Sequence, residues 1–124
     1  MDFTKRFKMF NELNDDQKNI IKEYAILKKA NKDETIFNDY DFVDNILVLS
    51  KGKIKLNSYS SDGKEYIFDI LVAEDVYGEN LLFKDSPYNV NLIAITDVEY
   101  YLIPFKSVEK MLVSYPKMSL KIIE

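Results

Sequence analysis

The sequence predicts a mainly β fold, either a double-layered antiparallel sandwich or a jelly roll, with helices at both chain ends. After about Ile26 apolar residues recur with a period of two, which is typical of half-buried strands. β-Branched and aromatic residues gather in short runs that are separated by Gly, Asp, Asn and Ser. The chain has 124 residues and is 47 % apolar, which suits one compact domain but not two.

Helical structure is predicted for the first 30 residues. Asn14 and Gln17 have capping-box spacing, so that Asn14 caps the first free amides and Gln17 reaches back. Lys28 and Lys29 stand where the negative end of a helix favours cations. Apolar residues recur at spacings of three and four, at Ile20, Ile21, Tyr24, Ala25 and Leu27. A second, short helical element is expected over residues 3–10.

Short strands are expected through most of the remaining chain. The expected strands are 34–37, 45–50, 53–59, 65–72, 75–77, 88–96 and 98–103. The pair Asp62-Gly63 is typical of a hairpin turn, because it supplies positive φ. Apolar residues alternate on both sides of this turn, with Ile54 and Leu56 before it and Tyr66, Phe68 and Ile70 after it.

A last helical pattern opens at Pro104, because the fixed φ of proline favours the start of a helix. Tyr115-Pro116 ends this pattern. A further helical run then starts at Pro116 and reaches the last residue after about two turns, which is too short for a stable isolated helix. We therefore expect residues 1–124 to form a single domain that is cut at the start of a C-terminal helix.

The composition excludes several common kinds of functional site. The chain contains no His, no Cys and no Trp. It therefore has no usual zinc ligand set, no thiolate iron–sulfur cluster and no axial His or Cys for haem. Ser-His-Asp and Cys-His catalysis and disulfide stapling are excluded as well. We expect no cofactor, no metal site, no catalytic residues and no enzymatic activity.

The net charge and the length of the apolar runs predict the location of the chain and two kinds of partner that it does not bind. With 17 Lys and Arg against 21 Asp and Glu, the formal charge is −4, which is the wrong sign for following a phosphate backbone. The longest apolar runs have four residues, as in 46–49, against the roughly 18 that cross a bilayer. We expect a cytoplasmic domain with no membrane partner and no nucleic-acid binding through this segment.

The segment from Asp75 to Phe83 carries the main functional signal. A strand ends at Gly78, and Glu79 and one apolar helical turn follow. This order places free backbone amides and a carboxylate together, an arrangement that suits a small polar ligand. A turn glycine followed by a solvated glutamate explains the same residues equally well when the segment is considered alone.

The order of the motifs adds a second signal. It runs from a helix through Lys51–Leu56, the Asp62-Gly63 hairpin, Gly78-Glu79 and Ala94–Asp97 to the helix after Pro104. Over about residues 10–124 this order resembles the cyclic-nucleotide-binding sensor domain of the Crp/Fnr family of bacterial transcription regulators. The three glycines of this chain, Gly52, Gly63 and Gly78, stand where that family carries glycine. At other family glycine positions this chain has Asp33, Tyr40 and Glu74. The resemblance implies a double-stranded β-helix, or jelly roll, of the cyclic-nucleotide-binding-domain type.

The resemblance also implies a ligand site. In members that bind a cyclic nucleotide, a Gly-Glu pair receives the ribose, and Gly78 and Glu79 match that pair. An Arg-Ser pair about ten residues later holds the cyclic phosphate, but Tyr88 and Asn89 occupy those positions here. Without the guanidinium a phosphate loses charge-assisted hydrogen bonds of roughly 1.5–3 kcal/mol each. The only arginine of the chain is Arg6, so high-affinity binding of cyclic AMP or cyclic GMP is not expected.

The expected ligand-binding residues form a turn, a loop and an apolar wall. They are Gly78, Glu79, Asn80, Tyr88, Asn89, Leu56, Phe68 and Leu71, with Asn91 at the mouth. Apolar walls with neutral polar groups favour a neutral or weakly polar small-molecule effector. A pocket that its own side chains fill is the alternative, because large apolar residues at alternate strand positions also form sandwich cores.

We expect the chain to be the ligand-sensing domain of a transcription regulator. The resemblance implies a C-terminal helix after Pro116 that makes the parent protein a homodimer and leads to a helix-turn-helix domain, through which DNA is bound. A degenerate domain used only for protein–protein contacts is one alternative. A small jelly-roll enzyme is another, which the lack of His disfavours.

Overall fold

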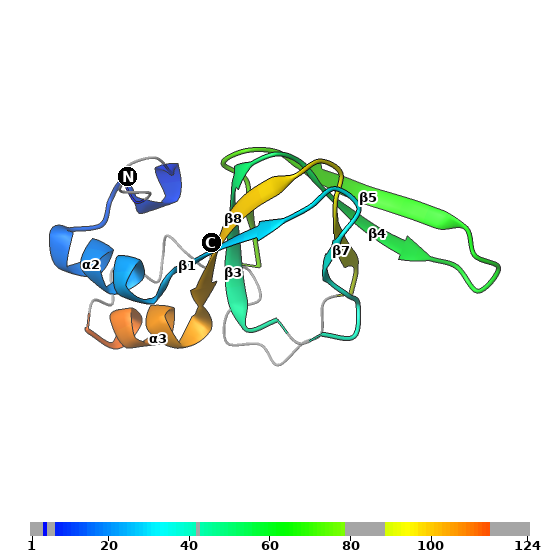
Figure 1. The fold of residues 1–124 in the computed structure, drawn as a ribbon. Helices are drawn as coiled ribbons and strands as arrows, with labels where there is room; N and C mark the ends of the chain where they lie inside the picture. Colours follow the sequence, from blue (N-terminus) through cyan, green and yellow to red (C-terminus); the bar gives the residue numbers. More distant parts are fainter. Residues whose placement is uncertain (1–3, 5–6, 42, 79–88, 115–124) are drawn as a thin grey trace.

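Two four-stranded antiparallel sheets form the body of the protein (Figure 1). The computed structural model describes residues 4, 7–41, 43–78 and 89–114. Sheet A has the order β1-β8-β3-β6 and sheet B the order β2-β7-β4-β5, which confirms the predicted jelly-roll class. The strands are β1 (Ile26–Ala30), β2 (Thr35–Phe37), β3 (Asn45–Lys51), β4 (Ile54–Tyr59), β5 (Glu65–Leu71), β6 (Val76–Tyr77), β7 (Asn91–Ala94) and β8 (Val98–Pro104).

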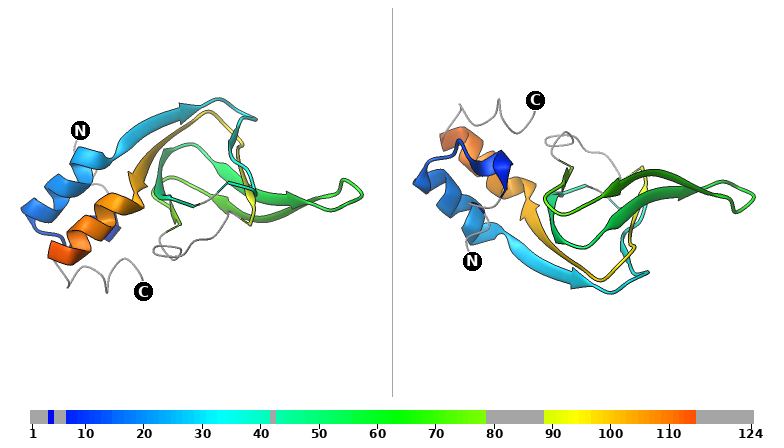
Figure 2. Two further views of the ribbon diagram at one scale, coloured as in Figure 1. Left: turned by 90° about the horizontal axis from the view of Figure 1, so that it is seen from below. Right: turned by 90° about the horizontal axis from the view of Figure 1, so that it is seen from above.

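The helices lie together at one end of the sheets. They are the 3₁₀ helix η1 (Lys8–Phe10) and the α-helices α2 (Asp15–Tyr24) and α3 (Phe105–Ser114), and α2 lies beside α3 in both views of Figure 2. The predicted capping box is present: the Asn14 side chain accepts from the Gln17 amide, and the Gln17 side chain accepts from the Asn14 amide, both at 2.8 Å. Within residues 3–10 the structure describes a helical Thr4 and η1, with an extended Phe7 just before η1.

The prediction for residues 26–30 was wrong. Helix α2 ends at Tyr24, and the next residues form β1 instead of a last helical turn. Strand β1 pairs with β8 from Ile26 opposite Leu102 to Ala30 opposite Val98. Pairing with a strand some seventy residues away outweighs the local helical spacing, which is a weak preference by comparison. The lysines expected to cap a helix therefore lie on a strand.

The core lies between the two sheets and continues under the helices. Its largest fully buried side chains come from η1, α2, β3, β4, β7 and β8, and include Phe10, Ile21, Ile46, Leu49, Ile54, Leu92 and Ile103. Tyr100 is buried and Tyr101 packs against the core. The expected strand 88–96 is present as β7 over a shorter range, and Tyr88 lies outside the described residues.

The hairpin of β4 and β5 projects from the body at the end opposite the helices (Figures 1 and 2). Gly63 has φ +87°, as the predicted turn requires. Apolar alternation along β5 does not correspond to burial, because Tyr66, Phe68 and Ile70 are all exposed. Ile70 pairs with Lys55 on the outer face of sheet B, and Tyr66 lies in the part of the hairpin that projects beyond the described body of the protein (Figure 1).

An ion pair across this hairpin leads to a pH prediction. Lys55 Nζ lies 2.7 Å from Glu65 Oε2, and the Asn57 amide donates to the same oxygen. These hydrogen bonds, that of Lys55 foremost, hold the pKa of Glu65 below its ordinary value of 4.5, while the Glu65 carboxylate raises the pKa of Lys55. A carboxylate whose pKa is lower in the folded than in the unfolded protein stabilises the fold at pH values above its unfolded-state pKa. This stabilisation is lost as the pH falls through the folded-state pKa.

We expect Glu65→Gln to reduce the change in the free energy of unfolding between neutral and acidic pH. Glutamine still accepts from Asn57 but lacks the charge that pairs with Lys55. The variant is therefore less stable than the wild type at pH 7. The free energies of unfolding of the two proteins become equal as the pH falls below 4.5. Urea unfolding at pH 7, 5, 4 and 3 measures the difference. Equal separation of the curves at every pH would show that the charge contributes nothing.

Candidate functional site

Gly78, the first residue of the predicted site, directly follows β6. It is buried and has φ +100°, a conformation that side-chain-bearing residues rarely adopt. A Cβ atom there would lie 3.1 Å from the Asn45 carbonyl oxygen and 3.6 Å from Val43 Cγ1. Both the backbone conformation and the lack of room for a Cβ atom therefore require glycine at this position. Of the residues expected beside it, Glu79, Asn80 and Tyr88 lie outside the part of the chain that the structure describes.

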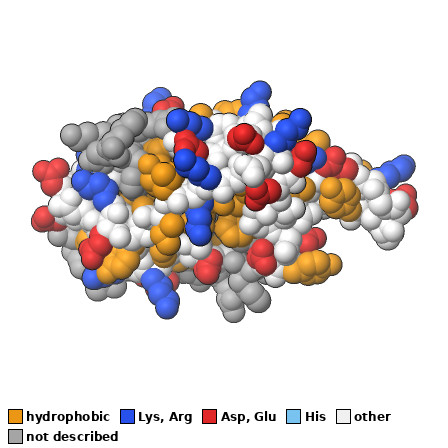
Figure 3. Space-filling model, viewed as in Figure 1, with side chains coloured by type: hydrophobic (Ala, Val, Ile, Leu, Met, Phe, Trp, Pro, Cys, Tyr) orange, Lys and Arg blue, Asp and Glu red, His pale blue; other side chains and the backbone are white. Residues whose placement is uncertain are grey.

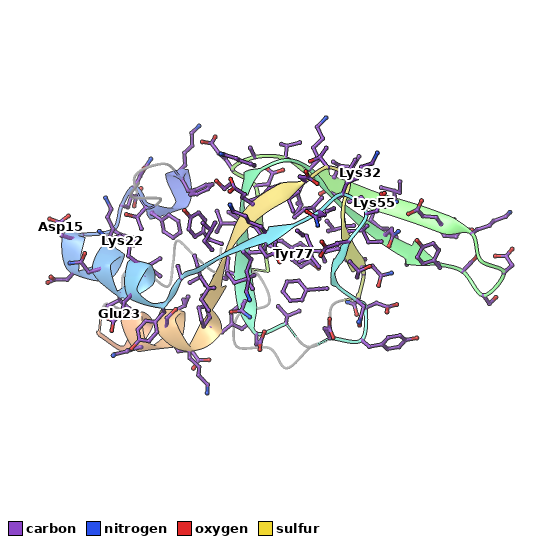
Figure 4. The ribbon with its side chains drawn as sticks, in the orientation of Figure 1. Asp15, Lys22, Glu23, Lys32, Lys55 and Tyr77 are labelled. Atoms are coloured by element: carbon purple, nitrogen blue, oxygen red, sulfur yellow. The ribbon has the colours of Figure 1, made fainter. Side chains whose placement is uncertain are left out.

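The apolar wall is formed by the inner face of sheet B. Leu56 and Leu71 are 7 % and 5 % exposed and belong to the hydrophobic core. Leu71 pairs with Ile54, and Leu56 pairs with Leu92 of β7, so these four side chains share the face directed toward sheet A. Figure 4 shows Tyr77, which directly precedes Gly78, between the two sheets. The structure therefore brings the wall and the glycine turn to the same interior.

Phe68 differs from the other two wall residues, because it is 62 % exposed. The β4–β5 register shifts beside it: Leu56 pairs with Asp69, whereas Asn57 pairs with Ile67. Phe68 is thus the extra residue of a bulge and has no direct partner on β4. Of the three apolar residues expected to form the wall, only Leu56 and Leu71 are therefore buried.

Asp69 is a residue of the candidate site that sequence reasoning missed. It pairs with Leu56, so its side chain lies on the same face of sheet B as the apolar wall. Its Oδ1 accepts from the amide of Ile70 at 2.8 Å, and the residue is exposed. A carboxylate at the open edge of the wall repels an anionic ligand. A bulge leaves no mark in a single sequence, so no signal placed Asp69 there.

Of the polar residues expected at the mouth, Asn91 lies on the other face of sheet B from the wall. Asn89 is exposed. Asn91 pairs with Asn57 and alternates with the buried Leu92, so it lies on the outer face of sheet B, away from the wall. Its Oδ1 accepts from the Asp39 amide at 3.0 Å. The expectation that Asn91 faces the pocket was wrong, because strand alternation directs it to the opposite side.

The surface charges are mixed. Figure 3 shows Lys side chains interspersed with those of Asp and Glu over the face it draws, with no area of one sign among the described residues. Within the described ranges, no three acidic side chains come together as a metal ion would require. The described helices also include none that is both long and apolar enough to cross a membrane.

Residues 27–115 match the family model described as cyclic nucleotide-binding domain. A CRP-like cAMP-activated global transcriptional regulator of Mycobacterium tuberculosis is 24 % identical over 85 residues, which are 68 % of this chain and 38 % of that protein. The chain therefore spans well under half the length of this relative. The match to the family model runs from Leu27 in β1 past the end of α3.

Two solved structures with the same fold come from transcriptional regulators. The N-terminal domain of a transcriptional regulator from Streptomyces coelicolor A3(2) has a TM-score of 0.82 at 24 % identity, covering 98 % of this chain and 85 % of that one. The sensor domain of the transcriptional regulator DNR from Pseudomonas aeruginosa has a TM-score of 0.85 at 18 % identity, covering 97 % and 85 %. The chain belongs to the cyclic nucleotide-binding domain family, and its fold is that of Crp/Fnr-type sensor domains.

Proposed function

We propose that this domain senses a small-molecule effector for a Crp/Fnr-type transcription regulator, and that the effector is not a cyclic nucleotide. The effector sits over Gly78, Glu79 and Asn80, beside the loop of Tyr88 and Asn89. The observation that carries the proposal is Gly78 itself. It is a buried, positive-φ glycine at a strand end in a family whose name states that it binds cyclic nucleotides.

The chemistry of the wall supports a neutral or weakly polar effector. Leu56 and Leu71 offer apolar surface, and Asp69 adds a negative charge to the same strand face. The matched position of the family arginine is Tyr88, which has no charge to pair with phosphate. An anion would lose its charge-assisted hydrogen bonds and also meet a carboxylate. Both effects disfavour cyclic AMP and cyclic GMP.

A matched pair of probes tests this proposal. Adenosine and cyclic AMP share base and ribose but differ in the charged cyclic phosphate. We expect calorimetry to detect no binding of cyclic AMP or cyclic GMP up to about 1 mM, and adenosine to bind more tightly than cyclic AMP. Micromolar binding of cyclic AMP would contradict the proposal.

The alternative is a domain that has lost ligand binding and acts through protein contacts. The observation in its favour is that Leu56 and Leu71 already pack in the core, which leaves less room for a ligand. This alternative expects that none of the three probes binds. A broader screen by thermal unfolding, in which no neutral compound raises the melting temperature, would then favour it.

The place of this domain in a larger protein belongs to the same proposal. We expect a cytoplasmic homodimer, joined through a helix that begins after Pro116 and leads to a DNA-binding domain. The relative in Mycobacterium tuberculosis is a transcriptional regulator of which this chain covers 38 %. The sequence of the whole gene product tests this expectation. A further 70–100 residues or so with a helix-turn-helix pattern would support it, and a stop codon after Glu124 would contradict it.

A further inference from the structure

The tip of the β4–β5 hairpin contains the only Asp-Gly pair of the chain, Asp62 and Gly63. The next aspartate along the chain, Asp69, is followed by the β-branched Ile70 instead. The carboxyl group of an aspartate can be attacked by the backbone nitrogen of the following residue, which closes a five-membered succinimide ring. Such intramolecular attack is far faster than the same reaction between separate molecules. Glycine leaves its nitrogen the most accessible, because it has no Cβ atom.

The structure leaves this pair exposed and uncrowded. Both residues are exposed, and they lie where the hairpin projects from the body of the protein (Figure 1). Among the described residues, chain neighbours aside, no atom comes within 4 Å of the position that a Cβ atom would take at Gly63. Ring closure at Asp62 therefore requires a change in the turn itself and no movement of a neighbouring element.

The hydrogen bonds of Ser60 hold the turn in an unreactive arrangement. The Ser60 hydroxyl group donates to Asp62 Oδ1 and accepts from the Lys64 amide at 3.1 Å. The Ser60 carbonyl oxygen accepts from the Gly63 amide at 2.9 Å. The carboxyl group and the nitrogen that would react with each other are thus both bonded to the same third residue.

The bond from the Ser60 hydroxyl group also affects the chemistry of the carboxyl group. It is the main cause that lowers the pKa of Asp62, so it favours the ionised form. A carboxylate is the less reactive form, because a carboxylic acid can lose water whereas a carboxylate would have to lose oxide. The reaction therefore proceeds when the tip opens locally, and exposed tips with few buried contacts open at a low cost in free energy.

We propose that Asp62 is a site of spontaneous isomerisation to isoaspartate, and that Ser60 slows this reaction. The Gly63 nitrogen forms a bond to Asp62 Cγ, and the carboxyl hydroxyl group leaves as water with the proton of that nitrogen. Water then opens the ring. Cleavage of the bond between nitrogen and Cγ restores aspartate, whereas cleavage of the bond between nitrogen and the former backbone carbonyl carbon gives isoaspartate. Nothing is oxidised or reduced, and water is the only other reactant.

The product alters the turn that closes the hairpin. In isoaspartate the main chain runs through Cβ and Cγ, so it gains one atom between the Cα atom of Asp62 and the nitrogen of Gly63. The hydrogen bonds between Ser60 and Lys64 then have to span a longer loop. Isomerisation therefore changes the hairpin end beside Glu65, which forms the ion pair with Lys55.

Incubation of the purified protein at pH 7.4 and 37 °C over several weeks tests the proposal. Trypsin cleaves after Lys55 and Lys64 and so releases the peptide of residues 56–64, in which Asp62 is the only aspartate. Reversed-phase chromatography separates its aspartate and isoaspartate forms, and the succinimide form is lighter by one water. We expect isoaspartate to accumulate at Asp62, with Asp69 as an internal control that stays unchanged. The test uses no ligand, so its result is independent of the proposed effector site.

Two serine variants test the role of Ser60. We expect Ser60→Ala to raise the rate of isomerisation about fivefold, the factor that corresponds to the loss of one hydrogen bond. The matched control is Ser61→Ala, which removes a hydroxyl group from the neighbouring exposed serine and leaves the rate unchanged. Circular dichroism verifies that both variants are folded. Absence of isoaspartate at Asp62 in both the wild type and Ser60→Ala would overturn the proposed site, and equal rates in the two variants would overturn the role of Ser60.

Discussion

Replacing Gly52 by alanine is expected to lower the free energy of unfolding by about 3 kcal/mol. Gly52 joins β3 to β4 with φ +88°. A Cβ atom at this residue would lie 2.4 Å from the Asp97 carbonyl oxygen, 2.6 Å from Thr96 Oγ1 and 2.8 Å from Val98 Cγ1. Such distances are too short for carbon, and the first involves backbone that cannot rotate away. The methyl group therefore forces two connections of the fold apart.

The hydrogen bonds at this contact show what would be lost. Thr96 Oγ1 accepts from the Lys53 amide at 3.1 Å and donates to the Asp97 carbonyl at 2.9 Å. These bonds hold the connection between β3 and β4 against the turn between β7 and β8. An alanine at Gly52 displaces that turn, so the backbone amide of Lys53 loses its acceptor as well.

Gly63→Ala is the matched control. Gly63 has φ +87°, almost the same conformation, but no atom lies within 4 Å of the position of its Cβ. The control therefore carries the backbone strain without the collision, and we expect a loss of about 1 kcal/mol. Thermal and urea unfolding of both variants measure the difference, with a fall in melting temperature of roughly 10 °C for Gly52→Ala. Equal losses would show that the close approach at Gly52 is unimportant.

Local signals predicted the features of the fold that are themselves local. The Asn14 capping box and the Gly63 turn depend on residues within four positions of each other, and both are present. Two of the three residues that stand where the family has glycine, Asp33 and Glu74, have positive φ here, at 73° and 79°, whereas Tyr40 does not. We made no prediction of backbone conformation at these positions.

Features that arise from pairing distant segments were not predictable in this way. Leu27 continues the helical spacing of α2, and only its pairing with Tyr101 makes it part of a strand. The bulge opposite Leu56 shifts the register of β5, which leaves Phe68 exposed and sets Asp69 on the wall. A single sequence records the side chains but not the register that decides which face they share.

Restoring the family arginine should have the largest effect on ligand binding. By the order of the family motifs, Tyr88→Arg with Asn89→Ser recreates the pair that holds a cyclic phosphate. Two charge-assisted hydrogen bonds of roughly 1.5–3 kcal/mol each correspond to a gain in affinity for cyclic AMP of at least about a hundredfold. Isothermal calorimetry of the double variant against the wild type measures this gain.

A lysine variant separates geometry from charge. Tyr88→Lys with Asn89→Ser adds the same charge as a mobile point, without the planar pair of donors, so we expect a much smaller gain. Adding Asp69→Asn to the arginine variant removes the carboxylate from the wall and should raise affinity a further few-fold, since it ends the repulsion between two anions. Adenosine has no phosphate, so its binding should change little in either variant.

These variants also decide between the two explanations for weak nucleotide binding. If the arginine variant gains affinity and the lysine variant does not, the pocket is open and lacks only its phosphate donors. If neither gains, while both unfold at the wild-type urea concentration, the packing of Leu56 and Leu71 closes the pocket. The second result would contradict the proposed effector site over Gly78, because restored phosphate donors cannot act where no ligand enters.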